Sequence, residues 1–258
     1  HKIDLFCLTR VAEDISKASE LLGLCRCVHV ERLTDFDLFF NGLGALLTGR
    51  SFNVFSYFSP RFRDALRAYR ESEEGKRVDV VLAHRLRMAP YAFEEGPKKP
   101  VVLELTDSMT LMTESLRSAP GIRLSRKLAA VWDRGVIADE ETNWVNLSAR
   151  AVLVSPMDSY FLQNQLKGTK GFVRTGRPFG PSPLGSVFYK RPEGNESKLA
   201  VIPNGVTSIK GNMPRPAIYP ARVPIVAFVG NMGYPPNEEG AIWFLKKVWP
   251  LVKASVPN

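Results

Sequence analysis

The sequence lacks any long apolar run. Its 258 residues contain no stretch of the roughly eighteen uninterrupted apolar residues that a membrane-spanning helix needs. Its first residues show no charged segment followed by an apolar one, which is the pattern of a secretory signal. The composition is also without extremes, since 45% of the residues are apolar and 24% are charged. These values are ordinary for a soluble globular protein with one large or two smaller domains.

Cysteine is scarce. Only Cys7, Cys25 and Cys27 are present, and each lies in an apolar, strand-like run. Cys25 and Cys27 with His29 supply too few ligands for a four-coordinate zinc site, and no second cysteine pair exists. We therefore predict buried structural thiols, no bound metal, and a reducing, cytoplasmic setting.

Several catalytic signatures are absent too. The sequence has no Walker loop, no G-x-G-x-x-G, no G-x-S-x-G and no H-E-x-x-H motif. The net charge of +9 admits nucleic acid, anionic lipid or an anionic substrate as a partner. The basic residues are scattered, apart from a segment at 168–198, and form no nucleic-acid-binding motif, so we expect no nucleic-acid partner.

What is present is an alternation of short apolar runs with helical patterns. About six strands precede Asn204, which predicts an α/β fold with a doubly wound parallel sheet. The runs Val78–Ala83 and Ala151–Ser155 are entirely apolar or nearly so, and are expected in the buried middle of that sheet. A further strand is predicted in "PIVAFVG" near the end, followed by a helix capped by Asn237.

These patterns divide the chain into parts. Residues 1–206 are predicted to form a first doubly wound α/β domain, with a Gly/Pro-rich basic insertion at 168–198 that is too long for an ordinary loop. Residues 207–223 are rich in proline and are expected to be a linker, and 224–258 begin a second α/β domain. The chain opens on a strand-like run and stops within a helical one, so we expect a fragment that lacks both ends.

Ligands of open parallel sheets bind at the carboxyl ends of the strands, so the residues there are site candidates. Thr106 and Asp107 follow one strand, and Asp107 either caps the next helix or contacts a ligand, with the cap favoured. Arg87 either binds an anion or belongs to a solvated face. The other candidates follow two later strands: Asn204, Gly205, Gly230, Asn231 and Met232.

Several stretches, in this order, resemble the family 4 retaining glycosyltransferases: "ALLTGRSFNVFSYFSPRFRDAL", "LRMAPYA", "VVLELTDSMTL", "AVLVSPMD", "VIPNGV" and "FVGNMGYPPNEEGAIWFLKKVWPLVK". The similarity is greatest to a bacterial branch, the exosortase/PEP-CTERM-associated sugar transferases of exopolysaccharide synthesis. The resemblance implies a GT-B architecture, in which two Rossmann-like domains face each other across a cleft. It also implies transfer of a sugar from a nucleotide-sugar donor to a glycan or lipid-linked acceptor, without a metal cofactor.

The resemblance also suggests roles for the candidate residues. Gly230, Asn231 and Met232 match the first donor-side loop. Thr106 and Asp107 match the loop where many relatives place a histidine that touches the donor sugar, and this sequence has no histidine there. Arg87 matches a family block without an assigned role. All three are expected as sugar or acceptor contacts. Asn204 and Gly205 match the crossover between the domains.

The catalytic glutamate of the family is expected beyond Asn258. The chain alone is therefore predicted to be inactive. Peripheral contact with the anionic inner face of the membrane is expected from the positive charge.

Two other function classes remain open on the sequence. A nucleotide-sugar epimerase or dehydrogenase should carry G-x-G-x-x-G and a Tyr-x-x-x-Lys pair, and neither appears here. A non-catalytic two-domain sugar-binding module would share the fold without the catalytic residues.

Overall fold

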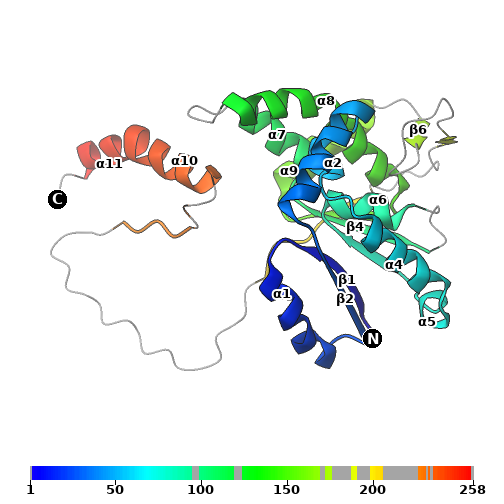
Figure 1. The fold of residues 1–258 in the computed structure, drawn as a ribbon. Helices are drawn as coiled ribbons and strands as arrows, with labels where there is room; N and C mark the ends of the chain where they lie inside the picture. Colours follow the sequence, from blue (N-terminus) through cyan, green and yellow to red (C-terminus); the bar gives the residue numbers. More distant parts are fainter. Residues whose placement is uncertain are drawn as a thin grey trace. The chain divides into compact units, whose positions relative to one another are not determined.

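A computed structural model gives the fold of the chain (Figure 1). It describes residues 2–94, 99–118, 124–168, 172–175, 187–190, 198–205, 226–230, 232 and 235–256. The chain divides into two compact units, His1–Asn204 and Gly205–Asn258, and each unit is described here by itself. The predicted linker at 207–223 and the candidate Asn231 lie outside the described residues.

The first unit alternates strands with helices, as the sequence predicts. Its elements in chain order are β1 (Asp4–Thr9), α1 (Ala12–Lys17), η1 (Ala18–Gly23), β2 (Cys27–Arg32), α2 (Asp35–Thr48), α3 (Phe52–Phe55), α4 (Pro60–Glu71), α5 (Glu73–Lys76), β3 (Val81–His84), η2 (Leu86–Met88), α6 (Ala89–Ala92), β4 (Val101–Thr106), α7 (Met109–Ser118), α8 (Leu124–Leu147), β5 (Arg150–Leu153), α9 (Pro156–Gly168), β6 (Phe172–Thr175), β7 (Val187–Lys190) and β8 (Leu199–Val201).

Local sequence signals explain several helix ends. Ser59 accepts a hydrogen bond from the Phe62 N–H and precedes Pro60, so α4 begins where a serine cap and a proline at the first turn predict. Thr34 and Asp37 form a reciprocal capping box at the start of α2. That helix ends at Gly49, whose φ of 64° is a left-handed conformation that glycine adopts without a steric penalty.

The strands form an α/β fold with parallel sheets. Strands β3, β4, β5 and β8 make a four-stranded parallel sheet in the order β3-β4-β5-β8, while β1 and β2 pair separately in parallel. The prediction of parallel strands is confirmed. The prediction of one continuous sheet is wrong for the described residues, because no strand there joins β1 to β3.

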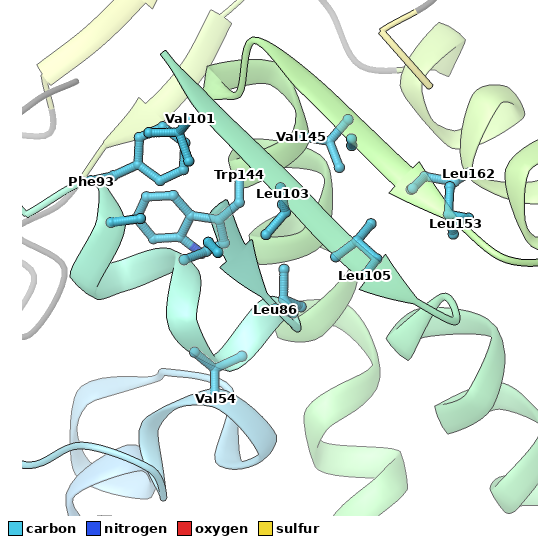
Figure 2. Close-up of a cluster of buried hydrophobic side chains, with 14 of the residues drawn as sticks. Val54, Leu86, Phe93, Val101, Leu103, Leu105, Trp144, Val145, Leu153 and Leu162 are labelled. Atoms are coloured by element: carbon cyan, nitrogen blue, oxygen red, sulfur yellow. The ribbon is translucent and has the colours of Figure 1, made fainter. Parts of the chain in front are cut away.

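The hydrophobic core lies around the four-stranded sheet. Leu103 on β4 and Leu153 on β5 are completely buried, and side chains from α8 and α9 pack against them (Figure 2). The rings of Phe93 and Trp144 stack with their centroids 5.4 Å apart. This packing joins the segment after α6 to the long helix α8.

The apolar run Val78–Ala83 was expected in the middle of the sheet, and that expectation is wrong. Its strand, β3, is an edge of the four-stranded sheet, and the Leu82 side chain is 66% exposed. By contrast, Ala151 and Leu153 of β5 are buried as expected. The difference arises because β3 has a strand partner on only one side, whereas β5 lies between β4 and β8.

Beside β3 lies a cavity of about 1410 Å³, called here the interstrand slot. Residues 2–6 of the β1 segment line one wall and residues 78–83 of the β3 segment line another. Side chains of α4 and α6, among them Phe62, Leu66 and Tyr91, also line it. The slot therefore lies between the β1 edge of one parallel sheet and the β3 edge of the other, and no backbone hydrogen bonds pair these two strands.

The basic insertion at 168–198 contains regular structure that the sequence analysis did not predict. Strands β6 and β7 pair as an antiparallel hairpin, from Phe172 opposite Lys190 to Thr175 opposite Val187. The residues between and after these strands, 176–186 and 191–197, lie outside the described part.

The second unit contains α10 (Pro235–Trp243), η3 (Phe244–Val248) and α11 (Trp249–Ser255). Residues 226–229 pair with no strand in the described part of the chain, so the strand predicted in "PIVAFVG" is not formed there. Helix α10 begins at Pro235, two residues before the predicted cap Asn237. The wider π-helical turn at Phe244–Val248 precedes Pro250, which has no N–H to continue the helical ladder.

An ion pair at the amino end of β1 gives a pH-dependent prediction. The Asp4 carboxylate accepts hydrogen bonds from Arg26, with Nε 2.8 Å from Oδ1, and from the Tyr69 hydroxyl. The Arg26 guanidinium is the main reason that the pKa of Asp4 lies below its usual value. A carboxyl with a lowered folded pKa stabilises the protein above its unfolded pKa of about 4, and that contribution is lost as the pH falls.

We therefore expect Asp4→Asn to lower the stability at pH 7 and to reduce the loss of stability between about pH 4 and pH 2. Urea unfolding of both proteins across this range measures the difference. Asp139→Asn, at an exposed position of α8, is the matched control and should follow the parent protein. Equal acid sensitivity of the parent and Asp4→Asn would contradict the prediction.

Candidate functional site

The candidate site lies at the carboxyl ends of β3 and β4, which are neighbours in the sheet. His84 is the last residue of β3 and Arg85 follows it, while Thr106 is the last residue of β4 and Asp107 follows it. In parallel sheets this edge is where ligands bind, because it carries the loops into the following helices. The structure thus brings the predicted pair Thr106 and Asp107 beside two residues of the preceding strand end.

Both strand ends hold a residue in an unusual backbone conformation. Arg85 has φ 68° and ψ 152°, and Thr106 has φ 65°. For a β-branched residue such as threonine a positive φ is a genuine outlier, and the conformation of Arg85 is close to one that only glycine adopts readily. The pairing of β4 with β5 also shifts register between Glu104 and Thr106. Such bulges and strained residues cluster at functional sites, where they direct side chains.

Glu104 organises the side chains at these strand ends. Its carboxylate contacts His84 Nδ1 and accepts a hydrogen bond from the Thr106 hydroxyl at 2.8 Å. The Arg85 N–H donates to the Glu104 carbonyl at 2.6 Å. Glu104 therefore links His84 and Thr106, and the Thr106 hydroxyl is connected to the site through its hydrogen bond to Glu104.

The start of α7 is satisfied without Asp107. The Ser108 N–H donates to Asp158, and the Leu111 N–H donates to the Ser108 hydroxyl. The N–H groups of Met109 and Thr110 donate to the buried carboxylate of Glu141, at 2.7 and 3.3 Å. The favoured interpretation of Asp107 as the helix cap is therefore wrong, because Ser108 and Glu141 perform that role.

Asp107 is exposed, and the pKa of its carboxyl lies above the usual value for aspartate. Partial burial raises the pKa of its carboxyl, and the negative charges of Asp158 and Glu104 raise this pKa further. The positive charge of Arg85 opposes them. A carboxylate in this setting can accept hydrogen bonds from hydroxyl groups of a ligand, with Arg85 as an adjacent cation.

Arg87 belongs to a packing contact. Its guanidinium lies over the Tyr57 ring, 4.1 Å from the centroid, and its Nε donates to the Asn53 carbonyl at 3.1 Å. Burial lowers the pKa of Arg87. These contacts attach η2 to the α3 segment. The interpretation of Arg87 as part of a solvated face is therefore wrong.

The remaining candidates lie elsewhere. Asn204 is exposed after β8, whose pairing continues to the Ile202 N–H bonded to the Leu153 carbonyl. Gly205, Gly230 and Met232 belong to the second unit. A Cβ placed on Gly230 would lie 3.1 Å from the Asn237 amide nitrogen, so this turn approaches the side chain of α10 closely.

The cysteines give no metal site. Cys7, Cys25 and Cys27 are all free thiols of intermediate exposure, rather than buried as predicted. Within the residues that the structure describes, no group of three or more His, Cys, Asp or Glu side chains is placed to hold a metal ion.

Glu141 is the functional residue that sequence reasoning missed. It is completely buried in α8, accepts three hydrogen bonds from the start of α7 and thereby positions the segment that follows Asp107. Burial raises its pKa, while the donors around it act in the opposite direction. The only signal in the sequence was an acidic pair, Glu140 and Glu141, in a helix with many apolar residues.

No protein-family model, curated protein or solved structure matches this chain. None of the described helices is long and apolar enough to cross a membrane.

Proposed function

We propose that this chain is part of a retaining glycosyltransferase. It would take part in breaking the bond between the anomeric carbon of a nucleotide sugar and its diphosphate, and in forming a bond from that carbon to an acceptor hydroxyl. The acceptor is a glycan or a lipid-linked sugar of bacterial surface polysaccharide synthesis. In this proposal the first unit is the acceptor-side domain of a GT-B protein.

The observation that carries the proposal is the exposed Asp107 carboxylate between Arg85 and Asp158, at the end of a central parallel strand. The adjacent helix start is already satisfied by other groups, so Asp107 remains available to a ligand. Sugars present several neighbouring hydroxyl donors, and a carboxylate is the acceptor that binds such donors most strongly.

The second unit would provide donor-side residues in this proposal. Gly230 and Met232 lie in the turn before α10, and a helix start offers N–H groups to a diphosphate. The net charge of +9 supports a peripheral contact with anionic membrane, which co-sedimentation with vesicles of increasing anionic lipid content tests.

Sugar binding at Asp107 can be tested by saturation-transfer NMR with a panel of UDP-sugars, GDP-sugars and short oligosaccharides. We expect at least one of these probes to bind, and Asp107→Asn to weaken its binding about tenfold, because hydrogen bonds to a charged group contribute about 1.5–3 kcal/mol. Saturation transfer should fall on protons of the sugar ring.

Asp139→Asn is the matched control, since it makes the same change at an exposed position of α8. It should bind the probe as the parent does. Absence of binding to every probe, or equal binding by the parent and Asp107→Asn, would overturn the proposed role of Asp107.

A further inference from the structure

Strand β3 ends in a histidine whose ring contacts a carboxylate on the neighbouring strand. His84 and Glu104 are partners in the register of β3 with β4, and the Glu104 carboxylate contacts Nδ1 of the imidazole. In the part of the chain that the structure describes, Nε2 of this ring has no hydrogen-bond partner. One ring nitrogen of His84 is therefore engaged by Glu104, and the other is available to a ligand.

The contact with Glu104 selects one form of the neutral imidazole. A neutral histidine carries its single N–H on Nδ1 or on Nε2, and the partner of one nitrogen decides the state of the other. An ionised carboxylate accepts hydrogen bonds and donates none, so Nδ1 of His84 is the N–H donor to Glu104. Nε2 then keeps a lone pair, which can accept a hydrogen bond or a proton.

The surroundings expose the histidine and shelter its carboxylate. The side chain of His84 is 64% exposed, whereas that of Glu104 is 23% exposed. The other oxygen of the Glu104 carboxylate accepts a hydrogen bond from the Thr106 hydroxyl at 2.8 Å, so each of its two oxygens has a partner. A carboxylate held in this way fixes the orientation of an imidazole and stabilises the positive charge that the ring acquires with a second proton.

The same carboxylate connects His84 with the candidate site. The negative charge of Glu104 acts on the Asp107 carboxyl, and so does the positive charge of Arg85, the residue after His84. Arg85 and Asp107 are both exposed, and they directly follow the neighbouring strands β3 and β4. His84, Arg85 and Asp107 are thus exposed side chains of one group of strand ends, with Glu104 between them.

Stability alone does not explain this arrangement. An ion pair with one largely exposed partner contributes little to the free energy of unfolding. The positive φ angles of Arg85, which follows His84, and of Thr106, which supports Glu104, are both unfavourable. The strand ends therefore hold the histidine and the carboxylate in place at a cost that the contact between them does not offset, which is typical of functional residues.

We propose that His84 is the proton acceptor of the candidate site and that Glu104 is its positioning residue. When Nε2 takes the proton of a bound hydroxyl, the O–H bond breaks, an N–H bond forms and the oxygen keeps the electron pair. The identity of the hydroxyl rests on the proposed glycosyl transfer. There the acceptor oxygen forms a bond to the anomeric carbon, while the diphosphate leaves with the electron pair of the broken carbon–oxygen bond.

Nitrogen-15 NMR of the whole chain, labelled in its histidine rings, measures the form of the imidazole. The sequence has only three histidines, so the signals lost in His84→Gln are those of His84. At about pH 9, where imidazoles are neutral, we expect a protonated Nδ1 and an unprotonated Nε2 in the parent chain. In Glu104→Leu, which has no acceptor for Nδ1, the ring should return to the Nε2–H form that predominates in free histidine.

Two further variants make this comparison specific. The amide oxygen of Glu104→Gln can still accept a hydrogen bond from Nδ1, so this variant should keep the parent form of the ring. Glu73→Leu is the matched control, because it makes the same substitution at an exposed glutamate of α5 and should leave His84 unchanged. An Nε2–H ring in the parent chain, or the same ring form in the parent and in Glu104→Leu, would overturn the proposal.

The reactivity of Nε2 is measured with diethyl pyrocarbonate. The lone pair attacks a carbonyl carbon of this reagent, an N–C bond forms and a C–O bond breaks. The departing ethyl carbonate takes up the Nδ1 proton and decomposes to carbon dioxide and ethanol. We expect modification of His84 to be about tenfold slower in Glu104→Leu than in the parent, which is typical when the outer partner of a functional histidine is removed. Equal rates would contradict the role of Glu104.

Neither measurement requires a sugar, so the proposal and the proposed function fail separately. A parent chain with an unprotonated, reactive Nε2 that binds no sugar probe would overturn the sugar-binding role of Asp107 and support the proton-accepting role of His84. A chain that binds sugar through Asp107 but has its His84 proton on Nε2 would overturn the role of His84 alone.

Discussion

Replacing Glu141 with alanine is expected to lower the free energy of unfolding by about 3 kcal/mol, because it leaves buried donors without an acceptor. The Glu141 carboxylate accepts hydrogen bonds from the Met109 and Thr110 N–H groups and from the Ser108 hydroxyl. Both Ser108 and Glu141 are completely buried, so water does not replace the lost acceptor without entering the core. The substitution also leaves a cavity between α7 and α8.

Chemical unfolding in urea, followed by circular dichroism, measures this loss. Asp139→Ala is the matched control, because it removes a carboxylate from an exposed position two residues earlier in the same helix, and it should change stability by less than about 0.5 kcal/mol. Glu141→Gln keeps one acceptor oxygen and should fall between the two. A Glu141→Ala protein as stable as the control would contradict the assigned role of Glu141.

The same substitution bears on the candidate site. Glu141 holds the Ser108 hydroxyl and the Met109 and Thr110 N–H groups, and Ser108 directly follows Asp107, so their release should also loosen the Asp107 loop. We therefore expect faster amide exchange at Asp107 and Ser108 in Glu141→Gln, under conditions where that variant remains folded. Faster exchange restricted to α8 would show that other contacts hold α7 and α8 together.

Replacing Phe62 with alanine is expected to have a similar or larger effect, a loss of about 4 kcal/mol, since large-to-small changes of a buried phenylalanine cost about 3–5 kcal/mol. Phe62 on α4 is completely buried. Its ring centroid lies 4.9 Å from that of Tyr91 in an edge-on arrangement and 6.4 Å from that of Phe6. The side chain thus connects α6 with the β1–β2 pair, and its removal loses both ring contacts.

Phe39→Ala is the matched control for this prediction. Phe39 lies on α2 and its side chain is 69% exposed, so its removal should cost less than about 0.5 kcal/mol. Thermal unfolding should show a much lower Tm for Phe62→Ala and an almost unchanged one for Phe39→Ala. Equal Tm values for the two variants would mean that Phe62 does not carry the packing assigned to it.

Local patterns predicted most of the elements because the signals for them lie within a few residues. Ser59 followed by Pro60 marks the start of α4, and Gly49 marks the end of α2. Strands β1 to β5 coincide with apolar runs that contain β-branched residues or are bounded by turns. The strand expected in "PIVAFVG" is not formed in the described residues 226–230, since a strand exists only when another segment completes its hydrogen bonds.

The candidate site could be predicted only in part. The position of Asp107 after a buried strand was visible, because strand ends follow from the apolar run "VVLEL". The neighbours of Asp107 were not visible, because Arg85 lies just after β3 and Asp158 lies on α9, both far from Asp107 in the sequence. The helix-cap interpretation was wrong because Glu141, more than thirty residues away in the sequence, accepts the N–H hydrogen bonds that Asp107 was expected to accept.

By itself the sequence determined that this protein is an α/β fold with parallel strands, and it located the ends of those strands, since apolar periodicity and capping residues are local properties. Only the tertiary structure decided that β3 is an edge strand and that a cavity separates it from β1. It also decided that Asp107 is exposed among other charges while Glu141 is buried. The physical reason is that strand neighbours, burial and charge proximity depend on segments far apart in the chain, which no local pattern records.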